Sequence, residues 1–161
     1  MLQTNFVYEL LKEAKARGLA TAMETSGYAN REKYEKIMPY VDEFLWDYKA
    51  TGDKIHKELT GVAQEKILDN LKYLYDQGAV IMLRCPIIPG VNDTEEHFQG
   101  IARKLYELER LKGWEIMPYH RLGIAKEKRL GMERHHEFEV PKKELVEQWK
   151  QKIEAYKKKC K

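Results

Sequence analysis

Hydrophobic residues recur along the chain in two alternating patterns. Stretches whose apolar residues lie three or four positions apart, as on one face of a helix, are followed by short apolar runs typical of buried strands. The first such pair predicts a helix over 3–17 and a strand over 19–26. Gly18 stands between them, where the end of a helix favours a residue with positive φ. The chain therefore opens with a helix that leads directly into a buried strand.

The same unit recurs three more times. The pattern predicts helices over 31–38, 64–77 and 93–111, and strands over 43–49, 79–85 and 114–119. Pro39 stops the first of these helices, and Asp93 with Glu96 resembles a capping box at the start of the third. After an irregular segment over 120–140, Pro141 opens a last helix.

Helices that alternate with short buried strands indicate an α/β fold with a parallel sheet of about four strands. Parallel strands need a crossover connection, and a helix is the usual one. We expect one domain over 1–161, flanked by helices. Because its first element is a helix, the chain begins in the middle of a βα repeat, and we expect a further segment upstream.

Composition narrows the class of protein. Hydrophobic residues make up 43% of the 161 residues and charged residues 34%, which is typical of one water-soluble domain. No apolar run reaches the ~18 to 20 residues of a membrane helix, and Met1 opens no signal segment, so the cytoplasm is the default location. A net charge of only +3 and the lack of a base-stacking motif argue against a nucleic-acid partner.

Cysteine usage excludes several kinds of site. The chain has two cysteines, Cys85 and Cys160. Two are too few for a disulfide scaffold, for a zinc ribbon, or for an iron–sulfur cluster with three or four thiolate ligands. We therefore expect no metal site in this chain.

Polar side chains gather at the predicted carboxyl ends of the strands. In parallel α/β sheets, ligands bind at these ends, where loops and helix N-termini meet. The four strand ends carry carboxylates, hydroxyls, two cations and an imidazole: Glu24, Thr25, Ser26, Asp47, Lys49, Arg84 and His120. Asp47 and Lys49 are two residues apart on one strand and so project to the same side. A local ion pair is the simpler interpretation of this pair, and a site for a zwitterionic or polyhydroxylated ligand is the alternative.

Five segments at these strand ends also carry a family resemblance. They are residues 24–28, 46–49, 53–62, 84–93 and 116–123. In order and spacing they strongly resemble the radical S-adenosylmethionine (SAM) enzymes that activate glycyl radical enzymes, the pyruvate formate-lyase activating enzyme family. Each motif alone is weak evidence, whereas several in register over about a hundred residues are specific.

The resemblance implies a partial six-stranded (β/α) barrel, similar to a TIM barrel, and an oxidoreductase activity. In this family a [4Fe-4S] cluster on three cysteines reduces SAM to methionine and a 5′-deoxyadenosyl radical. That radical removes a hydrogen atom from a glycine of the target enzyme. The implied partners are a glycyl radical enzyme of the pyruvate formate-lyase type and an electron donor such as flavodoxin or ferredoxin.

The resemblance also implies roles for the residues at the strand ends. Asp47 and Lys49 would contact the methionine and ribose parts of SAM, and Arg84 would hold the ribose or carboxylate side. His120 would lie near the ribose and the substrate glycine, which makes it the candidate catalytic residue. The same rim would be lined by Glu24, Thr25 and Ser26.

Two family motifs are absent. The chain lacks the C-x3-C-x2-C cluster motif and the Gly-Gly-Glu stretch that binds the amino group of SAM. It therefore resembles the last four βα units of the barrel with the C-terminal helix, the adenosyl-binding and target-facing part. We expect no [4Fe-4S] cluster bound to this chain, SAM binding that is weak at best, and no radical chemistry from the chain alone.

Two other functions compete with this interpretation. A cofactor-free protein-docking module derived from the same barrel is the main alternative, and the sequence upstream of Met1 distinguishes the two. A phosphate-binding α/β barrel needs a glycine-rich loop leading onto a helix N-terminus, which the chain lacks.

The remaining histidines and one charged loop need no role in cofactor binding. His56 and His97 are expected to be surface or capping residues, and 135–136 to be solvated. The cations at 126, 128, 129 and 134 form a charged loop that, by the resemblance, faces the glycyl radical enzyme.

Overall fold

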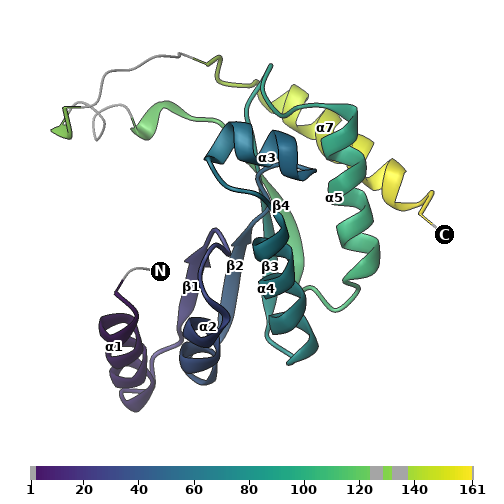
Figure 1. The fold of residues 1–161 in the computed structure, drawn as a ribbon. Coiled ribbons are helices and arrows are strands. Elements are labelled where there is room, and N and C mark those ends of the chain that lie inside the picture. The colour runs from purple at the N-terminus through teal and green to yellow at the C-terminus, as the bar shows by residue number, and fades with distance from the viewer. Residues whose placement is uncertain (1–2, 124–128, 132–137, 161) are drawn as a thin grey trace.

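The structure, a computed structural model, describes residues 3–123, 129–131 and 138–160. Its centre is a four-stranded sheet in the order β1-β2-β3-β4 (Figure 1). The strands are β1 (Ala22–Thr25), β2 (Glu43–Asp47), β3 (Ile81–Ile87) and β4 (Gly113–Pro118). All three neighbouring pairs are parallel. This confirms the predicted parallel α/β fold.

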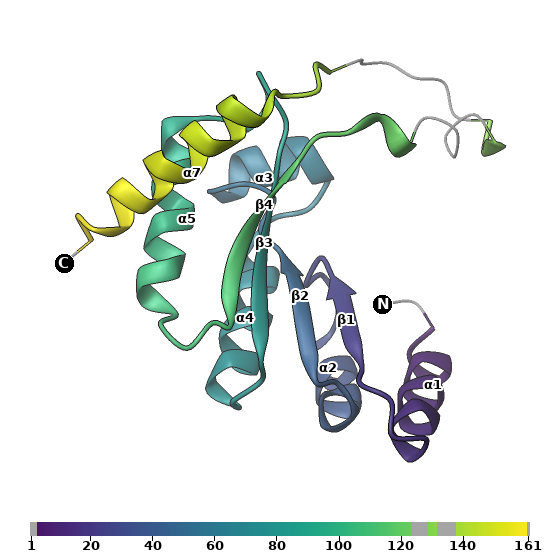
Figure 2. The same cartoon turned by 180° about the vertical axis from the view of Figure 1, so that it is seen from behind.

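The helices cover one face of this sheet. They are α1 (Thr4–Ala16), α2 (Arg31–Ile37), α3 (Asp53–Thr60), α4 (Glu65–Asp76), α5 (Glu95–Glu107) and α7 (Lys143–Lys157), with 3-10 turns η1 (Met38–Tyr40) and η2 (Arg121–Gly123). Seen from behind, the strands lie in front of the helices, and the short α3 sits at the carboxyl ends of the strands (Figure 2). No helix among the residues described has the length and apolar character needed to span a membrane.

Alternation along the strands sorts the side chains between the two faces. In β3, Ile81, Leu83, Cys85 and Ile87 are fully buried beneath the helices, and the intervening residues are only half-buried. Successive side chains of a strand point to opposite faces, so the apolar set meets the helices and the remainder faces the open side. Because the helices cover one face of the sheet, the apolar residues of each strand point to that face and the alternate residues reach the open face.

Two predicted strands begin later than the hydrophobic pattern indicates, for one shared reason. Leu19 was assigned to the first strand, but its N–H bonds to the carbonyl of Ala14 and so closes the end of α1. Ala79 likewise bonds to the carbonyl of Leu74 at the end of α4. In each case a glycine with positive φ precedes the residue, as in a Schellman motif. An apolar residue after such a glycine belongs to the helix cap.

The start of α5 also differs from the prediction. Thr94, and not Asp93, is the N-cap: its hydroxyl accepts the N–H of His97 at 3.2 Å. Asp93 instead accepts the N–H of Gly90 at 2.7 Å and closes the preceding turn. The expectation that His97 lies at the surface was wrong, because its side chain is buried against the segment that follows β2.

Gly27 lies in the loop after β1 and allows the closest approach of this loop to the core. Its φ is +80°, and a Cβ there would lie 2.4 Å from the Trp46 ring and 2.8 Å from Ile67. Trp46 is fully buried on the covered face. The loop can pack this tightly only because residue 27 has no side chain.

We expect Gly27→Ala to lower the free energy of unfolding by about 2 to 4 kcal/mol, since it combines a strained backbone with a core clash. Gly78→Ala is the matched control: its φ is +81°, yet a Cβ there meets no atom within 4 Å. The control should lose only about 1 to 2 kcal/mol. Urea denaturation of both variants checks this, and equal losses would contradict the proposed clash.

Candidate functional site

The open face of the sheet carries a charge cluster centred on Arg84. Arg84 lies opposite Asp47 of β2 and opposite Glu115 of β4 in the strand register. Its Nη1 lies 2.8 Å from Oε1 of Glu24, and its Nε lies 3.2 Å from Oε1 of Glu115. One guanidinium on a central strand thus connects carboxylates of both edge strands.

The environment of Arg84 leaves part of its donor capacity unused. Its side chain is only 13% exposed, whereas those of Glu24 and Glu115 are 64% and 50% exposed. Nη2 contacts the sulfur of Met117 at 3.4 Å, and the buried Nε has no hydrogen-bond partner despite its charge contact with Glu115. Guanidinium groups suit oxygen-rich anions because their donors are fixed in one plane. A ligand oxygen at this face could therefore be held by Arg84.

Asp47 and Lys49 form the local ion pair that their spacing favours. Lys49 Nζ lies 3.4 Å from Asp47 Oδ2, and the Asp47 side chain is 15% exposed. Burial raises the pKa of Asp47, although the charges of Lys49 and Arg84 oppose this effect. The carboxylate is thus less well solvated than in water, and hydrogen-bond donors from a ligand would stabilise its charged form.

Lys49 also borders two cavities at the carboxyl ends of the strands. One, of about 490 Å³, is lined by Leu59 of α3, Pro86 of β3 and Ile88 of the loop that follows β3, among others. The other, of about 210 Å³, is lined by Ser26 and Tyr28 of the loop after β1 together with Lys49. Two of the predicted site residues, Ser26 and Lys49, therefore share one cavity.

Thr25 is directed away from this rim. Its hydroxyl lies 2.8 Å from the Tyr34 hydroxyl and accepts the N–H of Gly27 at 3.0 Å. Tyr34 belongs to α2 on the covered face and is buried. The structure therefore places the Thr25 side chain beneath the sheet, where it shapes the loop after β1.

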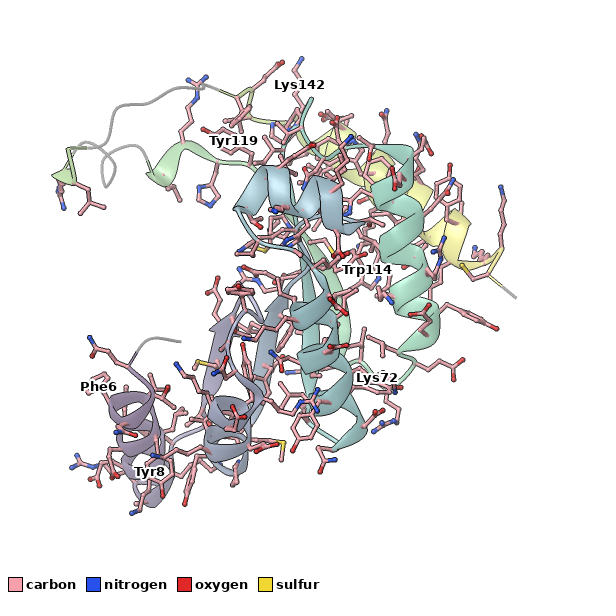
Figure 3. All side chains as sticks on the ribbon, in the orientation of Figure 1. Phe6, Tyr8, Lys72, Trp114, Tyr119 and Lys142 are labelled. Carbon is pink, nitrogen blue, oxygen red and sulfur yellow. The ribbon has the colours of Figure 1, made fainter. Side chains whose placement is uncertain are left out.

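His120 follows β4 at the same edge of the sheet as the other strand ends. It is exposed, and its Nδ1 accepts the N–H of Leu122 at 3.3 Å. The neighbouring Tyr119 packs edge-to-face on Phe138, with ring centroids 5.6 Å apart, and both Tyr119 and Lys142 are labelled in Figure 3. Arg129 is described as exposed, whereas the cations predicted at 126, 128 and 134 and the histidines at 135–136 lie outside the described residues.

Sequence reasoning missed Glu115 and Met117, which complete the surroundings of Arg84. Both lie on β4 two residues apart, and Glu115 is directly opposite Arg84 in the register. Alternation within the predicted strand would have placed them on one face. Their pairing with Arg84 required the register, which the sequence pattern alone does not determine.

The cysteines do not fit a [4Fe-4S] cluster. Cys85 is fully buried on the covered face, and burial raises the pKa of its thiol, which disfavours the thiolate that binds iron. Cys160 lies beyond the end of α7, where its Sγ contacts the carbonyl of Tyr156. Within the described residues, no group of three or more His, Cys, Asp or Glu side chains is arranged to hold a metal ion.

Beneath the rim lies a buried polar network around Thr51. Its hydroxyl lies 3.0 Å from His97 Nδ1 and 3.1 Å from the Tyr48 hydroxyl, and the rings of His97 and Tyr48 stack at 5.5 Å. The buried Nε2 of His97 has no hydrogen-bond partner among the described residues. Burial lowers the pKa of His97 from 6.5 to about 4, so the ring is neutral at pH 7.

The sheet is parallel, and a cation and a carboxylate lie on neighbouring strands of its open face. The sequence that forms this sheet matches a known family. The model for the radical SAM superfamily matches residues 1–105. The chain belongs to the radical SAM superfamily.

Relatives within this superfamily are activating enzymes. The chain is 39% identical over 136 residues to the choline trimethylamine-lyase activating enzyme of Oleidesulfovibrio alaskensis. The aligned region covers 83% of this chain and 44% of the relative. The chain is 32% identical to the pyruvate formate-lyase-activating enzyme of Clostridium pasteurianum over 83% of this chain and 56% of the relative. The chain thus spans about half the length of the curated relatives it matches.

A solved structure supports the fold. A domain of the pyruvate-formate lyase-activating enzyme from Bacteroides vulgatus superposes with a TM-score of 0.77 and 24% identity, covering 96% of this chain and 88% of that domain. The resemblance to the glycyl radical enzyme activating enzymes is thereby confirmed at the level of sequence and fold.

The depressed pKa of His97 makes stability depend on pH. The unfolded chain takes up this proton near pH 6.5, whereas the folded chain resists it to about pH 4, so acidification favours unfolding between these values. Between pH 7.5 and 4.5 we expect His97 to contribute a loss of about 2.5 kcal/mol, a loss that His97→Gln abolishes. Urea titrations at both pH values measure it. An unchanged dependence in His97→Gln would refute the assignment.

Proposed function

We propose that residues 1–161 form the SAM-binding and target-facing part of a radical SAM enzyme that activates a glycyl radical enzyme. The observation that carries the proposal is the Arg84 cluster, which gathers cations and carboxylates on the open face of a radical SAM sheet. The similarity to several activating enzymes supports the reaction class.

The side chains of this face suit the chemistry of SAM. Its methionine part carries both an ammonium and a carboxylate group, and its ribose offers two hydroxyls. Arg84, whose Nη2 meets only the sulfur of Met117 among the described residues, and Lys49 can bind carboxylate or ribose oxygens, while Asp47 can accept hydrogen bonds from the ribose hydroxyls. Ser26, which shares a cavity with Lys49, can contribute a hydroxyl at the same rim.

Exposed residues at the rim would face the target. We assign His120 a place near the ribose and the substrate glycine, and Glu24 a place at the outer side of the Arg84 cluster. The target is a glycyl radical enzyme of the pyruvate formate-lyase type, with flavodoxin or ferredoxin as electron donor, in the cytoplasm. The two cysteines of this chain do not fit the [4Fe-4S] cluster that the family uses.

A cofactor-free docking module with the same fold makes the opposite prediction for SAM. Such a module would keep the Arg84 cluster as a structural salt-bridge network, and SAM would not bind at the rim. The two functions are therefore separated by one binding measurement.

We expect SAM to bind this chain weakly, with perturbed NMR signals at Asp47, Lys49 and Arg84. Asp47→Asn should weaken binding about tenfold, because a hydrogen bond to a charged group contributes about 1.5 kcal/mol or more. Asp69→Asn, an exposed substitution of the same kind on α4, is the matched control and should bind as the wild type does. An NMR titration of each variant gives the dissociation constants. Equal affinities would contradict the role of Asp47.

Anaerobic reconstitution of this chain with iron and sulfide should give no stoichiometric reduced [4Fe-4S] signal by electron paramagnetic resonance. The reason is that Cys85 is inaccessible and Cys160 is remote from the rim. The Cys85→Ala variant should give the same spectrum as the wild type. A full cluster signal that disappears in this variant would show that Cys85 does ligate iron.

A further inference from the structure

The segment that connects β2 to α3 is anchored by buried side chains from other parts of the chain. It comprises residues 48–52, and the anchors lie on the four residues from Lys49 to Gly52. The backbone groups of loops normally face solvent. Hydrogen bonds from buried side chains to the backbone of a short loop therefore fix its conformation.

Asn92 provides the first anchor with a single carboxamide. Its Nδ2 donates to the carbonyl of Lys49 at 2.8 Å and to the carbonyl of Pro86 at 2.7 Å. Its Oδ1 accepts the N–H of Ile88 at 2.7 Å. The side chain is buried, and these three bonds tie the backbone of Lys49 to the end of β3.

Gln64 provides the second anchor from the start of α4. Its Nε2 donates to the carbonyl of Ala50, and its Oε1 accepts the N–H of Gly52 at 3.0 Å. Like Asn92, it is a buried amide. Between these two contacts, the Thr51 hydroxyl bonds to His97 and Tyr48. Each residue from Lys49 to Gly52 is therefore hydrogen-bonded to a buried polar side chain.

The anchoring has a consequence for the ion pair at the rim. Lys49 is a half-exposed residue, and its ammonium lies 3.4 Å from Asp47. A long side chain on a mobile loop would sample many positions and lose this contact, because an exposed ion pair barely repays the entropy of holding it. Fixing the backbone of residue 49 on both sides reduces the range that its ammonium can reach.

We propose that Asn92 and Gln64 are positioning residues that hold the Lys49 ammonium beside Asp47 and in reach of the SAM carboxylate or ribose. This proposal rests on the proposed function for its ligand. Both amides act on Lys49 through the backbone of residues 49–52. The charged pair is thereby set before the ligand arrives, which lowers the entropic cost of binding.

The test uses the pKa of Asp47, measured by ¹³C NMR of its carboxyl group, because the charge of Lys49 opposes the rise caused by burial. In Asn92→Ala and in Gln64→Met, a displaced ammonium should raise the pKa of Asp47 by about half a unit. SAM affinity should fall in the same variants by about threefold or more. Loss of packing alone would not move this pKa.

Thr21→Val is the matched control. Thr21 is also buried, and its hydroxyl donates to the carbonyl of Tyr40 and accepts the N–H of Asp42, but at the amino ends of β1 and β2. The substitution should lower the melting temperature while the Asp47 pKa and SAM affinity stay as in the wild type.

Each outcome decides the proposal. A wild-type Asp47 pKa in folded Asn92→Ala and Gln64→Met would overturn it, as would an equal shift in Thr21→Val. If Asn92→Ala does not fold, Gln64→Met alone decides. A wild-type chain that binds no SAM would overturn the proposed function, and the Asp47 titration would still decide the anchoring.

Discussion

The burial of one face of a parallel sheet is the constraint on which the structure depends. Helices cover that face, so every second residue of β2 and β3 must be apolar, and the alternate residues are directed to the open side. Trp46 and Leu83 supply the core, while Asp47 and Arg84, one residue further along their strands, reach the open face. The charge cluster therefore follows from the same alternation that builds the core.

Packing beneath the rim determines where the functional loops begin. Gly27 lets the loop after β1 lie against Trp46, and Asn70 of α4 donates hydrogen bonds to the carbonyls of Gly27 and Ala29. The loop after β2 is held in a similar way by Asn92. A buried amide that pairs with backbone carbonyls removes the cost of desolvating them, which is how irregular backbone can be packed inside a protein.

Much of this arrangement was predictable from the sequence, and the failures have physical causes. The four strands, five of the helices and the Asp47–Lys49 pair follow from period and spacing, whereas α3 was not predicted. The errors at Leu19 and Ala79 arose because an apolar residue after a helix-ending glycine resembles the start of a strand. His56 was expected to be exposed but is buried, with its Nδ1 2.7 Å from the carbonyl of Val62. The partners of this ring are close in sequence, but they meet it only because the chain turns at Gly61, at the end of α3, a helix that the apolar pattern did not predict.

The distribution of exposure within the Arg84 cluster bears on the kind of ligand it suits. The cation is largely buried, and the carboxylates of Glu24 and Glu115 are turned toward solvent. The Nε of Arg84 is buried against Glu115, but Nη2 meets only the sulfur of Met117 within the described part of the chain, a weak acceptor, so the guanidinium retains donor capacity. A ligand with both an anionic and a cationic end would complete the hydrogen bonding of the arginine and also meet the exposed carboxylates. The amino acid part of SAM has this character, so the geometry favours a binding face over a purely structural cluster.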